Sequence, residues 1–100
     1  MILLKPHTQK LMEIEALKEK LKATLQESRD IDADHDSQMA EVCSLTKEYF
    51  FESKTKEDKD RVEFEILNGL DCLDSLYRGI EEVGAKINRL EYRIAQLKEV

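Results

Sequence analysis

The stretch from Val62 to Leu97 reads VEFEILNGLDCLDSLYRGIEEVGAKINRLEYRIAQL, and its apolar residues recur every three or four positions. Written as heptads, the a positions are Ile66, Leu73, Ile80, Ile87 and Ile94, and the d positions are Val62, Gly69, Leu76, Val83, Leu90 and Leu97. A 3.5-residue repeat held over about five heptads is typical of a coiled coil rather than of one amphipathic helix on a globule. β-Branched residues at a with Leu or Val at d also favour two parallel strands.

The apolar stripe of this stretch changes width along its length. The first part of the seam, as we call the line of a and d positions, is flanked by four further apolar residues: Leu67, Leu70, Cys72 and Tyr77. From Ala85 onward the stripe narrows to the a and d positions, with charged residues such as Lys86, Arg89 and Glu91 around it. A wide stripe can bury against more than one neighbouring helix. We therefore expect three or four helices around the first part and a thinner arrangement around the tail.

Three glycines, Gly69, Gly79 and Gly84, fall in or beside the wide part of the stripe. Each costs about 1 kcal/mol of helix propensity relative to alanine. They are either tolerated small residues or points where another helix approaches closely or the helix bends locally.

The N-terminal half carries a weaker heptad repeat. Its a positions are Ile14, Leu21, Ser28, His35, Val42 and Tyr49, and its d positions are Leu17, Thr24, Ile31, Gln38 and Leu45. Thr8 after Pro6 is a suitable helix start, because proline fits the first turn and threonine can cap. The pattern predicts a first helix over residues 8–52 with a polar middle at 27–38.

A charged hinge is predicted at residues 53–61, before a second helix at 62–100. Seven of the eight residues from Lys54 to Arg61 are charged, and Thr55 followed by Asp58 resembles a capping box. The two heptad registers differ by three residues across this segment, which means either a turn or a stammer in one continuous rod. Two arms of about equal length favour the hairpin.

Composition excludes several other classes of protein. The chain has 100 residues, of which 38% are charged and 6% aromatic, with 3 Gly and 1 Pro. So few turn-forming residues argue against a β fold, and the short length argues against a large enclosed active site. The expected fold is all-α, with two long helices in a helical hairpin or extended coiled coil that assembles into a coiled coil or multi-helix bundle.

The charge and the cysteines suggest an intracellular protein that binds neither nucleic acid nor membranes. The net charge is −6, and no segment forms a basic stripe for phosphate groups. The apolar run Met1–Leu4 is too short for the core of a signal peptide, and no run of apolar residues is long enough to span a bilayer. Cys43 and Cys72 show no CxxC spacing, and their b and g positions do not face each other. We expect free thiols in a reducing compartment, cytoplasmic or nuclear.

An acidic segment in the first helix carries regularly spaced oxygen donors. They stand at positions 1, 3, 5, 7, 9 and 12 of a twelve-residue stretch: Asp30, Asp32, Asp34, Asp36, Gln38 and Glu41. This spacing resembles the calcium loop of the EF-hand family, and the resemblance implies a calcium-responsive helical switch. The segment departs from that family at His35, where the sharp turn needs glycine, and at Ser37, where the loop carries an apolar residue. The alternative is an acidic, solvated stretch of helix, in which His35 sets the register or acts as a pH switch.

Half of the aromatic residues are consecutive, at Tyr49, Phe50 and Phe51. They cannot share one helical face, so they form either a plug at the hairpin tip or an anchor for a partner.

We find no nucleophile–base pair, glycine-rich phosphate loop or His–Glu metal motif, and therefore expect neither enzymatic activity nor a cofactor. The main hypothesis is a coiled-coil protein–protein interaction or oligomerisation subunit that serves as scaffold, tether or spacer in a larger complex. The partner is another copy or, preferably, a different helical subunit, because a parallel homodimer would place Arg93 against Lys98. The second alternative, besides the calcium switch, is a small helical chaperone or adaptor using Leu70, Tyr77 and Tyr49–Phe51. The predicted interface comprises Val62, Ile66, Leu73, Leu76, Ile80, Val83, Ile87, Leu90, Ile94, Leu97, Tyr49 and Phe50.

Overall fold

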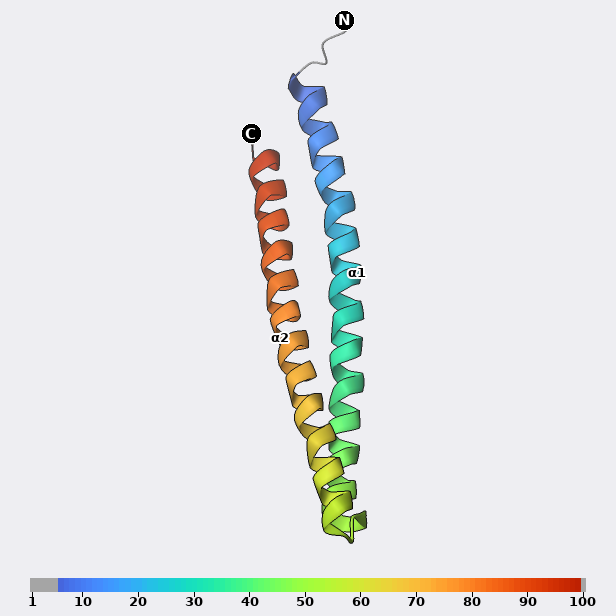
Figure 1. Ribbon diagram of the computed structural model, residues 1–100. Coiled ribbons are helices and arrows are strands. Elements are labelled where there is room, and N and C mark those ends of the chain that lie inside the picture. Colours follow the sequence, from blue (N-terminus) through green and yellow to red (C-terminus); the bar gives the residue numbers. More distant parts are fainter. Residues whose placement is uncertain (1–5, 100) are drawn as a thin grey trace, which may run out of the picture. The chain divides into compact units, whose positions relative to one another are not determined.

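The structure, a computed structural model, describes residues 6–99 and consists of two long helices in a hairpin (Figure 1). Helix α1 spans Pro6–Lys47 and continues into a π-helical turn, η1, at Glu48–Glu52, and helix α2 spans Lys56–Lys98. Within the described range only residues 53–55 and 99 lie outside helices, and no strand occurs. The predicted all-α hairpin is confirmed. The expectations for Met1–Leu4 and for the last residue of the second helix, Val100, concern positions outside the described residues.

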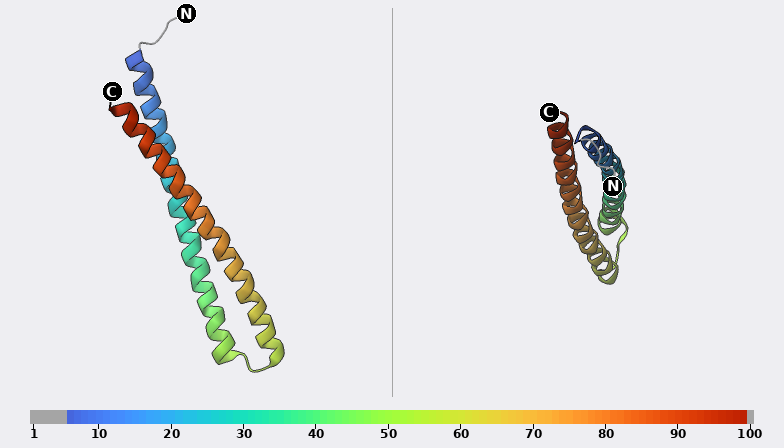
Figure 2. Two further views of the ribbon diagram at one scale, coloured as in Figure 1. Left: turned by 90° about the vertical axis from the view of Figure 1, so that its left-hand side faces the viewer. Right: turned by 90° about the horizontal axis from the view of Figure 1, so that it is seen from above.

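The described residues form two compact units. Unit 1 combines the residues up to Arg29 with those from Glu81 onward, and unit 2 is Asp30–Ile80. Each unit pairs a segment of α1 with an antiparallel segment of α2. Unit 2 also contains the turn, which Figure 2 shows as a short non-helical link between the two helices.

The predicted heptad positions form the seam in both units. Every a and d position from Ile14 to Leu97 is buried or half-buried. The most buried of these are Ile14, Thr24, Val83, Leu90 and Ile94 in unit 1, and Val42, Val62 and Gly69 in unit 2. Val62 is fully inaccessible to solvent. The heptad registers inferred for both halves are therefore confirmed.

The two helices of the hairpin pair antiparallel, whereas the preference for two parallel strands concerns pairing with another chain and stays a prediction. A link of three residues can only return the chain beside itself in the opposite direction. Within one chain this geometric constraint fixes the orientation, whichever residues occupy the a and d positions.

The turn is shorter than the predicted hinge at 53–61, because Lys56–Arg61 already belong to α2. The Asp58 N–H donates to Thr55 Oγ1 at 3.1 Å, which is the predicted cap and explains why the helix begins directly after Thr55. On the other side, the Ser53 N–H donates to the Glu48 carbonyl at 2.8 Å and closes the wide turn η1.

An ion pair connects the two helices beside the turn. The Arg61 guanidinium donates to Glu48 at 3.1 Å and to Glu65 at 3.3 Å. The hydrogen bond to Glu48, together with the charge of Glu65, raises the pKa of Arg61 above its usual value. An arginine side chain is charged at any physiological pH, so the guanidinium can bridge both carboxylates.

Candidate interaction surface

The residues predicted as the interface lie mostly in the seam between α1 and α2. Val62, Val83, Leu90 and Ile94 are buried there, and Ile66, Leu73, Leu76, Ile80, Ile87 and Leu97 are half-buried. The first partner of this seam is thus the chain's own α1. The side chains that this packing leaves most exposed lie at positions outside a and d.

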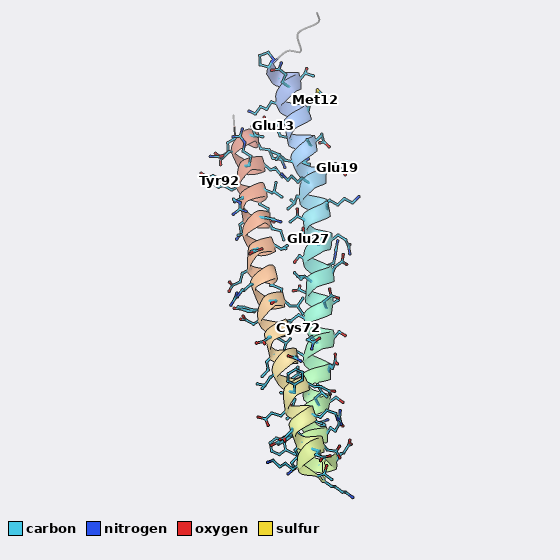
Figure 3. All side chains as sticks on the ribbon, viewed as in Figure 1. Met12, Glu13, Glu19, Glu27, Cys72 and Tyr92 are labelled. Carbon is cyan, nitrogen blue, oxygen red and sulfur yellow. The ribbon has the colours of Figure 1, made fainter. Side chains whose placement is uncertain are left out.

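The two sides of an antiparallel seam differ, because e positions of both helices flank one side and g positions flank the other. The g side is identified in unit 1 by an ion pair at 3.1 Å between Glu13 and Arg93, which both occupy g positions. Figure 3 shows that Glu13 lies on the α2 side of α1, whereas Tyr92, at an f position, points away from α1.

The e side of unit 2 carries large apolar side chains that the hairpin leaves half exposed. Met39 from α1 is 45% exposed, while Leu70 and Tyr77 from α2 are 47% and 55% exposed. Leu67, at the adjoining b position, is 54% exposed. These four residues are called the apolar e face below. Leu67, Leu70 and Tyr77 are among the flanking residues that the sequence singled out, whereas Met39 was not assigned to any site.

Register places Met39 and Leu70 opposite each other across the seam. A Cβ atom on Gly69 would lie 2.6 Å from Val42 Cγ2, so Val42 at a and Gly69 at d share one layer. Met39 lies three residues before Val42, and Leu70 lies one residue after Gly69. Both are e positions. The apolar e face therefore draws on both helices rather than on one stripe of α2.

The surroundings of the apolar e face are acidic. Its e, b and f neighbours include Asp32, Asp36, Glu63, Asp71 and Asp74. The nearby cation Arg78 forms an ion pair with Asp74 at 2.8 Å. Residues 30–80 hold fourteen acidic and six basic side chains, which gives unit 2 a net charge of −8.

Two open grooves lie on the g side. In unit 1 a groove of about 550 Å³ is lined by Leu17, Lys20, Thr24, Glu27, Lys86, Arg89, Leu90 and Arg93, so that basic side chains predominate. In unit 2 a groove of about 420 Å³ is lined by Gln38, Glu41, Leu45, Glu65, Asn68 and Gly69, and both of its charged residues are acidic. The grooves thus have opposite charge and few apolar side chains, unlike the apolar e face.

The three glycines fall into two groups. A Cβ atom on Gly69 would lie 2.6 Å from Val42 Cγ2, and one on Gly79 would lie 2.5 Å from Ile31 Cδ1. A Cβ atom on Gly84 would meet no atom within 4 Å. The first two mark close approach of the helices, and the third is a tolerated small residue.

The aromatic cluster at the turn is divided between packing and solvent. Tyr49 is half-buried, its ring meets Phe50 edge to face at 5.0 Å, and Lys59 Nζ lies 5.7 Å from its centre. Phe50 and Phe51 remain 69% and 83% exposed. Tyr49 therefore packs at the tip, whereas the two phenylalanines remain exposed to solvent.

The acidic segment Asp30–Glu41 is continuous α-helix in the structure. Its donors consequently project in several directions instead of converging as in a calcium loop. Among residues 6–99, no group of three or more His, Cys, Asp or Glu side chains is arranged to hold a metal ion. His35 is half-buried in the seam, and both cysteines are free and exposed.

No helix in the described part of the chain is long and apolar enough to cross a bilayer. No family model, curated protein or solved structure matches the chain.

Proposed function

We propose that this protein is a non-enzymatic coiled-coil interaction subunit that acts as scaffold, tether or spacer in a larger complex. The observation that supports the proposal is the apolar e face, since Met39, Leu67, Leu70 and Tyr77 extend the apolar pattern beyond the seam of the hairpin. Helices with apolar residues at a, d and e are typical of bundles with more than two helices. The hairpin supplies two helices, and a partner supplies the rest.

The proposed partner is a different helical protein rather than a second copy, and the proposed location is inside the cell. The net charge of −8 on unit 2 makes contact between two copies of that unit unfavourable. Two free cysteines are compatible with a reducing compartment.

The test is whether the full chain enters a defined complex through helix–helix contacts. Affinity purification from its native cells, followed by sedimentation and cross-linking mass spectrometry, should return a stoichiometric partner cross-linked through a helix. A folded monomer at micromolar concentration that recovers no helical partner would refute the proposal.

Seam variants need a folding control in this experiment. Ile87→Asp and Leu90→Asp should abolish assembly, but they also place a charge between α1 and α2, and Leu90 is only 9% exposed. Circular dichroism of the same variants should show loss of helix. Assembly that persists in variants that have lost their helices would contradict the proposal, because the proposed contact needs a folded hairpin.

A small helical chaperone or adaptor is the second candidate, because Phe50 and Phe51 are exposed beside the turn. A chaperone or adaptor differs from a scaffold subunit in its resting state, which would be a stable monomeric hairpin that binds clients reversibly. Measurement of the mass of the isolated chain and of the lifetime of the complex separates the two.

A further inference from the structure

We propose that the apolar e face of unit 2 docks an amphipathic, lysine- or arginine-rich helix from another protein. The inference rests on the proposed function and adds the surface, the binding mode and the chemistry of the partner. The four anchors are Met39, Leu67, Leu70 and Tyr77, each about half exposed.

The spacing of the anchors fits a helix better than an extended peptide. Leu67, Leu70 and Tyr77 follow one another at intervals of three and seven residues, so they line one side of α2 over three turns. Met39 adds a contact from α1, opposite Leu70. A helix laid along this side would bury its own i, i+3, i+4 and i+7 residues against both helices of the hairpin, as in other helix-in-groove complexes.

The charge of the partner follows from the acidic surroundings. Asp32, Asp36, Glu63 and Asp71 border the apolar e face, and Arg78 is already paired with Asp74 at 2.8 Å. Opposite charges at the margin of an interface steer association and exclude partners of the wrong sign. A helix with basic residues beside its apolar stripe would attract these carboxylates. An acidic helix, or unit 2 of another copy of the chain, would be repelled by them.

The cysteines allow a site-specific test. Cys43 lies at a b position one turn after Met39, on the e side of α1, whereas Cys72 lies at a g position of α2, on the opposite side of the seam. Both thiols are exposed and can carry an environment-sensitive fluorophore. In the full-length Cys72→Ser variant the fluorophore is attached to Cys43 and reports from the e side. In the Cys43→Ser variant it is attached to Cys72 and reports from the g side.

The probe is a synthetic leucine, alanine and lysine peptide of about 18 residues, or five helical turns. One control peptide replaces each lysine by glutamate, and a second scrambles the sequence so that the charge remains but the apolar stripe is lost. We expect the lysine helix to bind with a fluorescence change at Cys43 and little change at Cys72, and both controls to bind at least tenfold more weakly.

Variants of the protein complete the test. Leu70→Gln combined with Tyr77→Gln leaves the net charge unchanged and should weaken binding at least tenfold, whereas Tyr92→Gln, at an exposed f position of unit 1, should not. Circular dichroism confirms that each variant retains its helices.

Three results would overturn the inference: equal responses at Cys43 and Cys72, unchanged affinity of the double variant, or equal binding of the scrambled peptide. If the lysine helix fails to bind but the chain still forms a stoichiometric complex with a helical protein or with itself, this inference fails and an interaction role stands. If neither occurs, both proposals fail.

Discussion

Replacement of each glycine in α2 by alanine should reveal how closely the two helices approach each other. Alanine is favoured over glycine by about 1 kcal/mol in a helix interior, whatever the surroundings. The three positions differ only in what the added methyl group meets. At Gly84 it meets nothing within 4 Å, so Gly84→Ala should stabilise the protein by about 1 kcal/mol.

The same methyl group on Gly69 would lie 2.6 Å from Val42 Cγ2. Valine has one strongly preferred rotamer in a helix, so the contact can be relieved only if the helices move apart. Such overpacking costs about 1–3 kcal/mol, which outweighs or cancels the gain in propensity and leaves Gly69→Ala less stable by about 0–2 kcal/mol. At Gly79 the neighbour is Ile31 Cδ1, the end of a flexible side chain, and we expect a net effect between those of the other two.

Urea unfolding followed by far-ultraviolet circular dichroism measures these differences. Gly84→Ala and Gly69→Ala should differ by about 1–3 kcal/mol, since the propensity term is common to both. Val42→Ala should partly rescue Gly69→Ala, with a coupling energy of at least about 0.5 kcal/mol. Equal stabilisation by the two glycine substitutions, or no coupling to Val42, would refute the close approach at Gly69.

Three further predictions concern the cap, the core and the acidic segment. Thr55→Ala should lower the free energy of unfolding by about 1 kcal/mol because the Asp58 N–H loses its acceptor, whereas Thr55→Ser should have little effect. Val62→Ala should cost about 2 kcal/mol in the same urea assay, since two fully buried methyl groups are lost, and Phe64→Ala, at a position 65% exposed, should cost under about 0.5 kcal/mol. Addition of calcium should change neither the helicity nor the melting temperature, because Asp30–Glu41 is helical and its donors diverge; a calcium-dependent rise in melting temperature would contradict this.

The parts of the fold that the sequence predicts are those governed by local periodicity. Most of the a and d positions from Ile14 to Leu97 are recognisable because an apolar repeat of 3.5 residues is typical of paired helices. The Thr55 cap is equally local, since donor and acceptor lie three residues apart. Even the polar residues Ser28 and Gln38 are half-buried in the seam, because the helical residues before and after them fix their register.

The parts that the sequence does not predict depend on which helix meets which. Heptads alone do not fix the orientation of the pair, and only the short link at 53–55 makes it antiparallel. Met39 could not be assigned to a surface, because its pairing with Leu70 follows from that orientation. The predicted hinge extends to residue 61, past the actual start of α2 at Lys56, because exposed charged residues suit both a hinge and the first turns of a helix.

The hairpin connection also determines the order in which the chain can fold. The Glu48–Arg61 contact joins residues 13 apart in the sequence, and the Glu13–Arg93 contact joins residues 80 apart. If each contact formed in an otherwise unfolded chain, closing the longer loop would cost about 1.6 kcal/mol more free energy than closing the shorter one, because each doubling of loop length costs about 0.6 kcal/mol. Closure from the turn outward avoids this cost, because each layer shortens the loop that the next must close. Residues around Val62 and the Thr55 cap should therefore form the folding nucleus, and the pairing near both termini should be the last to form and the first to open.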